Sequence, residues 1–301
     1  MKGSPGWTGL CCITMIMATL ATCRPADATK VVKRKIKHTL SETPGKFALA
    51  FRDLSSDASI RINSGKIYHA ASTMKTAVLI ELYRQAAEGK LAMSDSVMVR
   101  NQFKSIVDGS PYALKQRDDG EQTLYSRIET KCTYDTLAYA MITRSSNLAT
   151  NILVDILGAA NITGTVHSLG ASSMKILRGV EDSLAYAKGW NNVTTADDLL
   201  TIFEGLALGK AGDTKSCASI IDILSHQQFN EVIPAELPPD ITVAHKTGSF
   251  TGVHHDSGIV FLPDGRKYVL VILSRKLKDD KAAVKAMASV SKIIYDWEVG
   301  R

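Results

Sequence analysis

The sequence predicts an α+β fold, in which one α/β lobe is made from both ends of the chain and an all-α lobe is inserted between them. Two observations carry this prediction. Strand-like segments occur near both ends, at about 46–63 and 242–274, and helical patterns fill the region of about 90–230. A chain of 301 residues with 45% hydrophobic residues can bury a sizeable core. The cleft between two such lobes is where a functional site is expected.

The first 28 residues have the order of a secretory signal peptide. Lys2 precedes an apolar run over residues 10–20, and Ala26-Asp27-Ala28 resembles a small-residue cleavage site. The apolar run is too short to span a bilayer as a helix. We therefore expect residues 1–28 to be a signal peptide and residues 29–301 to be an exported domain, periplasmic or secreted, with no membrane span.

The cysteines and histidines suggest no metal site. Of five cysteines, only Cys132 and Cys217 lie beyond residue 28, and two cysteines in an oxidising compartment could pair if their backbones come close enough. Neither they nor the histidines have the spacing of a metal site, so we expect no metal. Cys23 follows a segment that resembles a bacterial lipoprotein box, which makes a lipid anchor the alternative to plain secretion.

The expected mature chain begins with an amphipathic helix that has a basic outer face. Val32, Ile36 and Leu40 recur at the four-residue spacing of one helix face, and lysines and an arginine lie between them. A basic run also suits nucleic acid or a membrane surface, but a solvated helix face explains it more simply in an exported protein. We therefore expect no nucleic-acid partner.

A predicted hairpin and a buried helix follow. Lys46–Asp53 and Ser59–Asn63 read as two strands, and the segment between them is rich in turn-forming residues. The helix from about Ser72 to Gly89 is apolar nearly all round in its first half, which indicates a position in the middle of the protein.

The later elements return from helix to strand. Tyr134–Leu157 is predicted as one long helix that ends at Gly158. Thr195 is predicted to cap another helix, because acidic residues follow it in the first turn. The remaining expected elements are strands at 242–246, 258–262 and 268–274, a tight turn at 263–266 and a final helix at about 279–298.

Ser72-Thr73-Met74-Lys75 places a serine and a lysine on one face of the buried helix at its start. Residues three apart share a helix face, so the lysine amine can reach the serine hydroxyl. A serine alone is a poor nucleophile and needs an adjacent base, and a helix N-terminus stabilises developing negative charge. The same spacing also occurs at Ser172–Lys175 and Ser289–Lys292, so the motif alone is a weak signal.

Two further motifs single out Ser72. Ser145-Ser146-Asn147 lies within a long predicted helical region, and Lys246-Thr247-Gly248 ends a predicted strand. At ordinary residue frequencies the second motif arises by chance in about one chain in fifteen. Only Ser72 precedes both motifs with strands before it and a buried helix after it.

With this ordered set, the sequence resembles the class A β-lactamases and penicillin-binding proteins, and most of all the branch of β-lactamase-related serine hydrolases. The resemblance covers essentially the whole mature chain, and the segments 178–182, 244–248 and 252–256 also carry it. It implies an antiparallel sheet flanked by helices from both termini, plus an inserted all-α lobe. The expected α/β lobe comprises about 29–75 and 225–301, and the expected all-α lobe about 76–224.

The resemblance also implies roles for individual residues. Ser72 is the expected nucleophile, and Lys75 takes part in its activation. Ser145 relays a proton to the leaving nitrogen. The backbone N–H groups of Ser72 and Ser249 are expected to form the oxyanion hole. The residues expected to bind the substrate are Asn147, Lys246, Thr247, Gly248, Ser249 and His254.

Glu181 matters most for naming the activity. This glutamate and the leucine three residues later match the loop that carries the deacylating general base in class A β-lactamases. Such a base makes the difference between releasing an opened β-lactam and remaining acylated by it. The resemblance therefore implies that Glu181 is catalytic.

Three residues depart from the family pattern. Ala185 stands where β-lactamases usually have an asparagine that helps to hold the hydrolytic water, and Asn191 or Asn192 is the alternative holder. Ser146 replaces an aspartate. His254 stands where an arginine commonly assists with the substrate carboxylate, and a histidine supplies that charge only when it is protonated.

The leading expectation is a monomeric serine β-lactamase that opens small-molecule β-lactams without a cofactor. The departures keep a second enzyme class open, a D,D-peptidase or esterase acting on peptidoglycan-like or small esters. A third alternative is a penicillin-binding sensor that is acylated but does not turn over.

Overall fold

The computed structural model describes residues 1–3 and 25–301, and its centre is a five-stranded antiparallel sheet. The strands lie in the order β2-β1-β11-β10-β9, so strands from the two ends of the chain pair directly at β1 and β11. The α+β prediction is confirmed. The strands are β1 (Lys46–Asp53), β2 (Ser59–Ile62), β9 (Thr242–Phe250), β10 (Val253–Phe261) and β11 (Lys267–Arg275).

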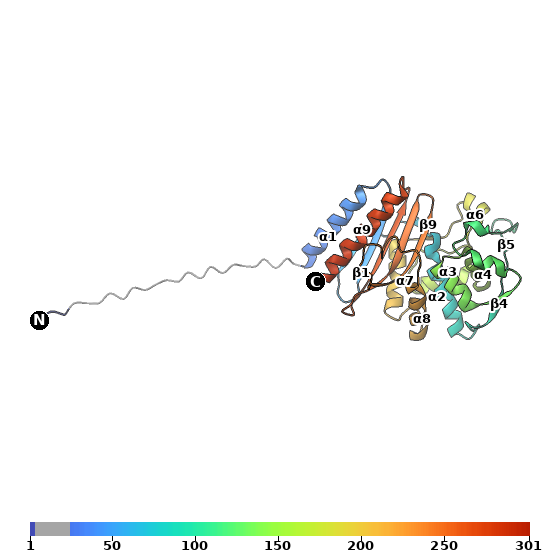
Figure 1. Cartoon of the computed structure of the whole chain (residues 1–301), viewed down its shortest axis with the longest axis horizontal. Helices are drawn as coiled ribbons and strands as arrows, with labels where there is room; N and C mark the ends of the chain where they lie inside the picture. The colour runs from blue at the N-terminus through green and yellow to red at the C-terminus, as the bar shows by residue number, and fades with distance from the viewer. Residues whose placement is uncertain (4–24) are drawn as a thin grey trace.

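The helices α1 (Pro25–Ser41) and α9 (Asp280–Val299) lie side by side over one face of this sheet (Figure 1). Strand residues alternate between the two faces, as the two-residue period of a strand requires. Leu49 and Phe51 of β1 face these helices, and they pack with Ile36 of α1 in a single apolar core. The amphipathic first helix expected from the sequence is therefore confirmed.

The opposite face of the sheet carries α7 (Ala196–Ala207), while α8 (Thr214–Ser225) packs beside β9. Helix α7 begins with a capping box, in which Thr195 and Asp198 satisfy each other's backbone N–H groups. Both helices belong to the segment expected to form the all-α lobe, yet they lie against the sheet because their apolar faces pack on its strands.

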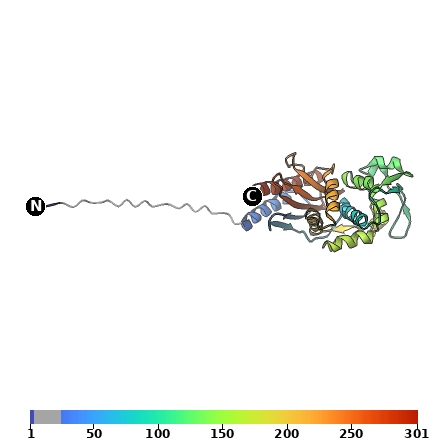
Figure 2. The same cartoon turned by 90° about the horizontal axis from the view of Figure 1, so that it is seen from below.

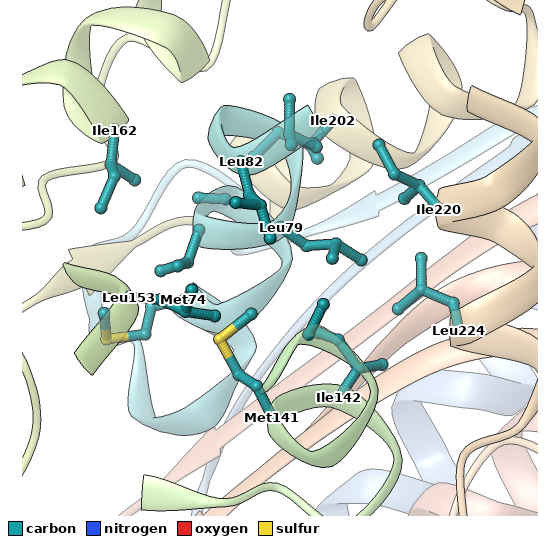
Figure 3. Close-up of a cluster of buried hydrophobic side chains, with 14 of the residues drawn as sticks. Met74, Leu79, Leu82, Met141, Ile142, Leu153, Ile162, Ile202, Ile220 and Leu224 are labelled. Carbon is teal, nitrogen blue, oxygen red and sulfur yellow. The ribbon is translucent and has the colours of Figure 1, made fainter. Parts of the chain in front are cut away.

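Helix α2 (Met74–Ala87) forms the centre of the second core (Figure 3). Its side chains Met74, Leu79 and Leu82 are almost completely buried, and they lie among apolar side chains from the surrounding helices. The buried helix expected from the sequence is confirmed, although it begins two residues later. The surrounding helices include α3 (Tyr134–Thr143), α4 (Asn147–Leu157) and α5 (Ala159–Ser168).

Figure 2 shows the same arrangement from below, with the green helices of the inserted segment farthest from α1 and α9. Short strands, turns and one short helix, in this segment and just before it, shape the loops around the site. They are β3 (Tyr68–His69), β4 (Ser96–Met98), β5 (Phe103–Lys104), β6 (Pro111–Tyr112), β7 (Lys131–Thr133), α6 (Ser183–Ala187), β8 (Val193–Thr194) and the 3-10 turns η1 (Ala71–Thr73), η2 (Gln116–Asp118) and η3 (Gln122–Arg127).

The single helix predicted over 134–157 is wrong, because the structure divides it into α3 and α4. The break falls at Ser145, whose φ of 56° lies in the left-handed region that no helix interior tolerates. Ser146 then caps α4, since its hydroxyl accepts a hydrogen bond from the backbone N–H of Ala149. The apolar periodicity continues through this break, which is why the sequence pattern did not reveal it.

The expected signal peptide and the lipid-anchor alternative at Cys23 fall mainly on residues 4–24, outside the described part of the chain. The described helix α1 begins at Pro25, three residues before the end of the predicted leader. Among the helices of the described residues, none is both long and apolar enough to cross a membrane.

Candidate active site

Ser72 lies on the 3-10 turn η1, directly before α2, and it borders an open cavity of about 560 Å³. The preceding residue, Ala71, has a φ of 47°, which tilts the turn out of helical geometry. Left-handed backbone at a residue other than glycine costs about 1–3 kcal/mol and persists only where its surroundings fix it. Asn147, Glu181 and Ser249 border the same cavity, so the structure brings four of the predicted site residues together.

Gly248 allows the edge strand β9 to lie directly against this turn. A Cβ atom at this position would come 2.8 Å from the backbone nitrogen of Ser72 and 3.0 Å from that of Thr73. A side chain there would push the strand away from Ser72, so the glycine of the Lys246-Thr247-Gly248 motif has a steric purpose.

Lys75 is completely buried behind Ser72. Its Nζ lies 2.7 Å from the backbone oxygen of Ser145, 3.1 Å from the Ser145 hydroxyl and 2.8 Å from Oδ1 of Asn147. The Ser72 hydroxyl is not among its hydrogen-bond partners in the structure. Burial, assisted by the positive charge of Lys246, holds the pKa of Lys75 well below its usual range.

A neutral Lys75 fits its three contacts. Its two N–H bonds can point to the two oxygens that only accept, on the backbone of Ser145 and on Asn147. Its lone pair then faces the Ser145 hydroxyl, which can donate to it. The arrangement therefore provides a base at the end of a short proton path.

Lys246 approaches the same hydroxyl from β9. Its Nζ donates to Oγ of Ser145 at 3.1 Å and to the backbone oxygen of Thr247 at 3.0 Å. Burial lowers the pKa of Lys246 to about 7, and the carboxylates of Asp256 and Glu231 oppose this decrease. The Ser145 hydroxyl therefore lies between two buried amines, one able to accept a proton and the other able to supply one.

Glu181 is connected to Lys75 through Asn147, whose Nδ2 donates to Oε1 of Glu181 at 2.6 Å. Glu181 has a φ of 61°, so its backbone is left-handed, like that of Ser145 and that of Ala71, which precedes Ser72. The residue opens onto the cavity, but its carboxyl group is partly enclosed. That burial raises the pKa of the Glu181 carboxyl, although the hydrogen bond from Asn147 opposes the increase.

Asn151 on α4 holds the Glu181 loop in place, and no sequence motif marks this residue. Its side-chain amide exchanges two hydrogen bonds with the backbone of Val180, at 2.6 and 3.0 Å. A Cβ atom on Gly179 would come 2.3 Å from Oδ1 of Asn151, so this close approach requires a glycine. The one sequence feature that points to Asn151 is its polar amide within a mostly apolar, buried helix segment.

None of the three candidates for holding a hydrolytic water has a hydrogen bond to Glu181 in the structure. Ala185 is fully buried and donates its backbone N–H to Asp182. The Asn192 side chain binds backbone groups of Leu177 and Arg178. The Asn191 oxygen accepts from the Arg178 guanidinium.

The side chain of His254 does not border the cavity beside Ser72. Its Nε2 lies 3.4 Å from Oε1 of Glu231, and both residues border a separate cavity of about 420 Å³. No hydrogen bond joins His254 to Ser145, Lys246 or Thr247. The histidine predicted to bind the substrate carboxylate therefore has an acidic partner of its own.

Cys132 and Cys217 are buried and unpaired. Within the described ranges 1–3 and 25–301, no three His, Cys, Asp or Glu side chains are arranged to hold a metal ion.

The sequence model of the family described as "Beta-lactamase enzyme family" matches residues 31–297. The extended-spectrum beta-lactamase PER-1 of Pseudomonas aeruginosa is 20% identical over 299 residues, which cover 95% of this chain and 93% of that protein. Beta-lactamase SME-1 of Serratia marcescens is 23% identical over 276 residues, which cover 89% of each.

Solved structures show the same fold. PBP-A matches with a TM-score of 0.76 at 26% identity, covering 90% of this chain and 97% of that chain. A beta-lactamase of Sphaerobacter thermophilus DSM 20745 matches with a TM-score of 0.75 at 23% identity, covering 89% and 98%. Since the family match extends over nearly all of the described fold, the chain belongs to the beta-lactamase enzyme family.

Proposed function

We propose that this protein is a serine hydrolase that opens β-lactams through an acyl-enzyme on Ser72. The observation that carries the proposal is the position of the Ser145 hydroxyl, 3.1 Å from both Lys75 and Lys246 and behind the turn that bears Ser72. This is a proton path with a base at one end and a partly charged amine at the other.

In the acylation step, the Ser72 oxygen attacks the lactam carbonyl carbon and its proton passes to neutral Lys75. The backbone N–H groups of Ser72 and Ser249 stabilise the oxyanion, and such donors are each typically worth about 3–4 kcal/mol in a transition state. The C–N bond then breaks, and the Ser145 hydroxyl gives its proton to the leaving nitrogen. Lys75 returns a proton to Ser145, which restores the path.

Substrate binding is assigned to the groups at the β9 edge. Lys246 and the Thr247 hydroxyl hold the substrate carboxylate, and Asn147 contacts the side-chain amide of the substrate. We exclude His254 from this set because its ring pairs with Glu231.

Deacylation is assigned to Glu181, which borders the cavity beside Ser72. Its carboxylate takes a proton from water as the water oxygen attacks the ester carbonyl carbon. The bond to the Ser72 oxygen then breaks, and that oxygen takes up a proton as Glu181 gives its own back, which restores both groups. Burial raises the pKa of Glu181. As the pH falls, Glu181 should therefore become protonated, and deacylation should be lost, at a higher pH than with a free glutamate.

A penicillin-binding protein that deacylates very slowly is the second candidate. The observation in its favour is that Asn147 occupies one oxygen of Glu181, while neither residue 185 nor the neighbouring asparagines supply a second hydrogen bond for water. PBP-A has also been solved, in a variant form, as an acyl-enzyme complex with penicillin G, at 26% identity to this chain.

The time course of the intact-protein mass after addition of a penicillin separates the candidates. We expect a mass increase equal to one penicillin that appears and then decays. A persistent adduct would favour the penicillin-binding protein, and the absence of any adduct would favour an esterase of another kind.

We further propose that the protein is exported, on the charged, apolar and small-residue order of its first 28 residues. The intact mass and the N-terminal sequence of protein recovered from outside the cytoplasm test whether cleavage follows Ala28.

The value of kcat/KM for a β-lactam with a free carboxylate should fall as the pH rises through about 7. Lys246 has a pKa of about 7, so it is charged below this pH and loses its attraction for the carboxylate above it. The measurement is a pair of pH–rate profiles between about pH 5.5 and 8.5, for a penicillin and for its methyl ester, which lacks the charge.

The variant His254→Gln should retain this fall, because His254 pairs with Glu231. A flat profile in that variant would instead assign the titration to His254. An equal fall for the methyl ester would show that a catalytic step, rather than carboxylate binding, depends on the titrating group.

A further inference from the structure

A short segment outside the family motifs contacts the Ser145-Ser146-Asn147 motif from behind. Asp119, Gly120 and Glu121 lie between the turns η2 and η3, and we call these three residues the 119–121 clamp. Each of the three contacts the chain at or beside Ser145 in a different way.

The Asp119 carboxylate is buried in the clamp and is 5% exposed. It accepts hydrogen bonds from the backbone N–H groups of Asn147 at 3.0 Å and Leu148 at 2.8 Å. It also accepts from the Tyr125 hydroxyl at 3.0 Å and the Ser146 hydroxyl at 3.5 Å. These backbone groups form the N-terminus of α4, where a negative charge is favoured.

Gly120 brings the clamp into direct backbone contact with the motif. A Cβ atom at this position would come 2.1 Å from the backbone oxygen of Arg144, which immediately precedes Ser145. Glu121 adds an ion pair to the Arg144 side chain at 3.3 Å. The backbone of Ser145, with its φ of 56°, is therefore held from both sides of its own position.

We propose that Asp119 is a positioning residue of the active site, whose carboxylate fixes Ser145 and Asn147 where they contact Lys75 and Glu181. The carboxylate that Ser146 lacks is thus supplied from a separate loop. The kinetic part of this proposal rests on the proposed acylation of Ser72, but its structural part does not.

The Asp119 charge also acts on the base itself. Lys75 is surrounded by Lys246 from β9, by Glu181 from its loop and by Asp119 from the clamp. Burial and Lys246 lower the pKa of Lys75, whereas Asp119 and Glu181 raise it. Removal of the Asp119 charge should therefore lower the pKa of Lys75 further.

The test compares Asp119→Asn with Asp279→Asn, a matched control in which a helix-capping aspartate is neutralised on α9, on the other face of the sheet. We expect Asp119→Asn to acylate about 100-fold more slowly, as a displacement of about 1 Å in a reacting group can cause. Its acidic limb in the acylation pH profile should move to lower pH. The control should lose thermal stability with neither kinetic change.

The double variant Asp119→Asn/Ser146→Asp supplies a carboxylate at the cap of α4 from within the motif. We expect it to recover part of the acylation rate and to return the acidic limb toward its original pH. If Asp119→Asn does not fold, Asp119→Glu replaces it, and the acidic limb should then stay in place while the rate falls.

Hydrogen exchange of the amides in 144–150 is measured on the same proteins without substrate. Faster exchange at Asn147 and Leu148 in Asp119→Asn, but not in Asp279→Asn, supports the positioning role even if no β-lactam reacts. In that case only the proposed function fails. Exchange and acylation in Asp119→Asn that match the control would overturn the positioning role.

Discussion

Replacement of Ser72 by alanine should abolish all covalent labelling by β-lactams and lower kcat by at least about 10³-fold. Loss of a serine nucleophile is expected to have an effect of this size or larger, because no other group can form the acyl-enzyme. Ser72 borders the cavity at the turn before α2, and the buried amine of Lys75 lies on the first turn of the same helix. The measurement is intact-protein mass spectrometry with a penicillin, combined with steady-state hydrolysis.

The chain offers two matched controls, at the other serines that have a lysine three residues later. The hydroxyl of Ser289 donates to Glu236, and Lys292 beside it pairs with Asp296. Ser172 and Lys175 are both exposed. The variants Ser172→Ala and Ser289→Ala should label like the wild type. Labelling that survives in Ser72→Ala would refute the assignment of the nucleophile.

Replacement of Glu181 by glutamine should leave acylation in place and slow deacylation by about 10²–10⁴-fold, the usual contribution of a positioned general base. Glutamine keeps the size of the side chain and its oxygen can still accept from Asn147, but it cannot take a proton from water. The decay of the acyl-enzyme, followed by mass spectrometry after removal of excess penicillin, measures the effect. Decay as fast as in the wild type would make Glu181 a solvated loop residue.

The variant Ala185→Asn asks whether the wild-type water is poorly held. Ala185 lies in α6, in the same loop as Glu181, and its side chain is completely buried. We expect the added amide to speed deacylation without a change in the acylation rate. No change in deacylation would mean that another group already orients the water.

The elements that the sequence predicts well are those whose pattern repeats over several turns or strand residues. β1 has the predicted bounds, and α7 begins at the predicted cap because Thr195 and Asp198 act on their own helix. The break at Ser145 was not predictable in the same way. It depends on contacts from the 119–121 clamp, which lies more than twenty residues earlier in the chain.

The same distinction applies to the candidate site. Ser72, Lys75 and Lys246 are predicted from short motifs, whose spacing is visible in the sequence. Asp119 and Asn151 were missed because their contacts are made to backbone groups far along the chain, and a lone acid or amide carries no pattern. The contact between His254 and Glu231 is not predictable from strand position alone, because the two residues lie more than twenty positions apart in the chain.

The left-handed backbone at Ala71, Ser145 and Glu181 has a consequence for how this protein can evolve. At each of these positions the local chain would be more stable as glycine, since glycine adopts such angles without steric cost. Glycine at 71 would loosen the turn that carries Ser72, the proposed nucleophile, and glycine at 145 or 181 would remove a side chain that we assign to proton transfer. Selection for thermal stability and selection for turnover therefore oppose each other at these three positions. Gains in heat resistance that leave turnover intact must come from elsewhere in the fold.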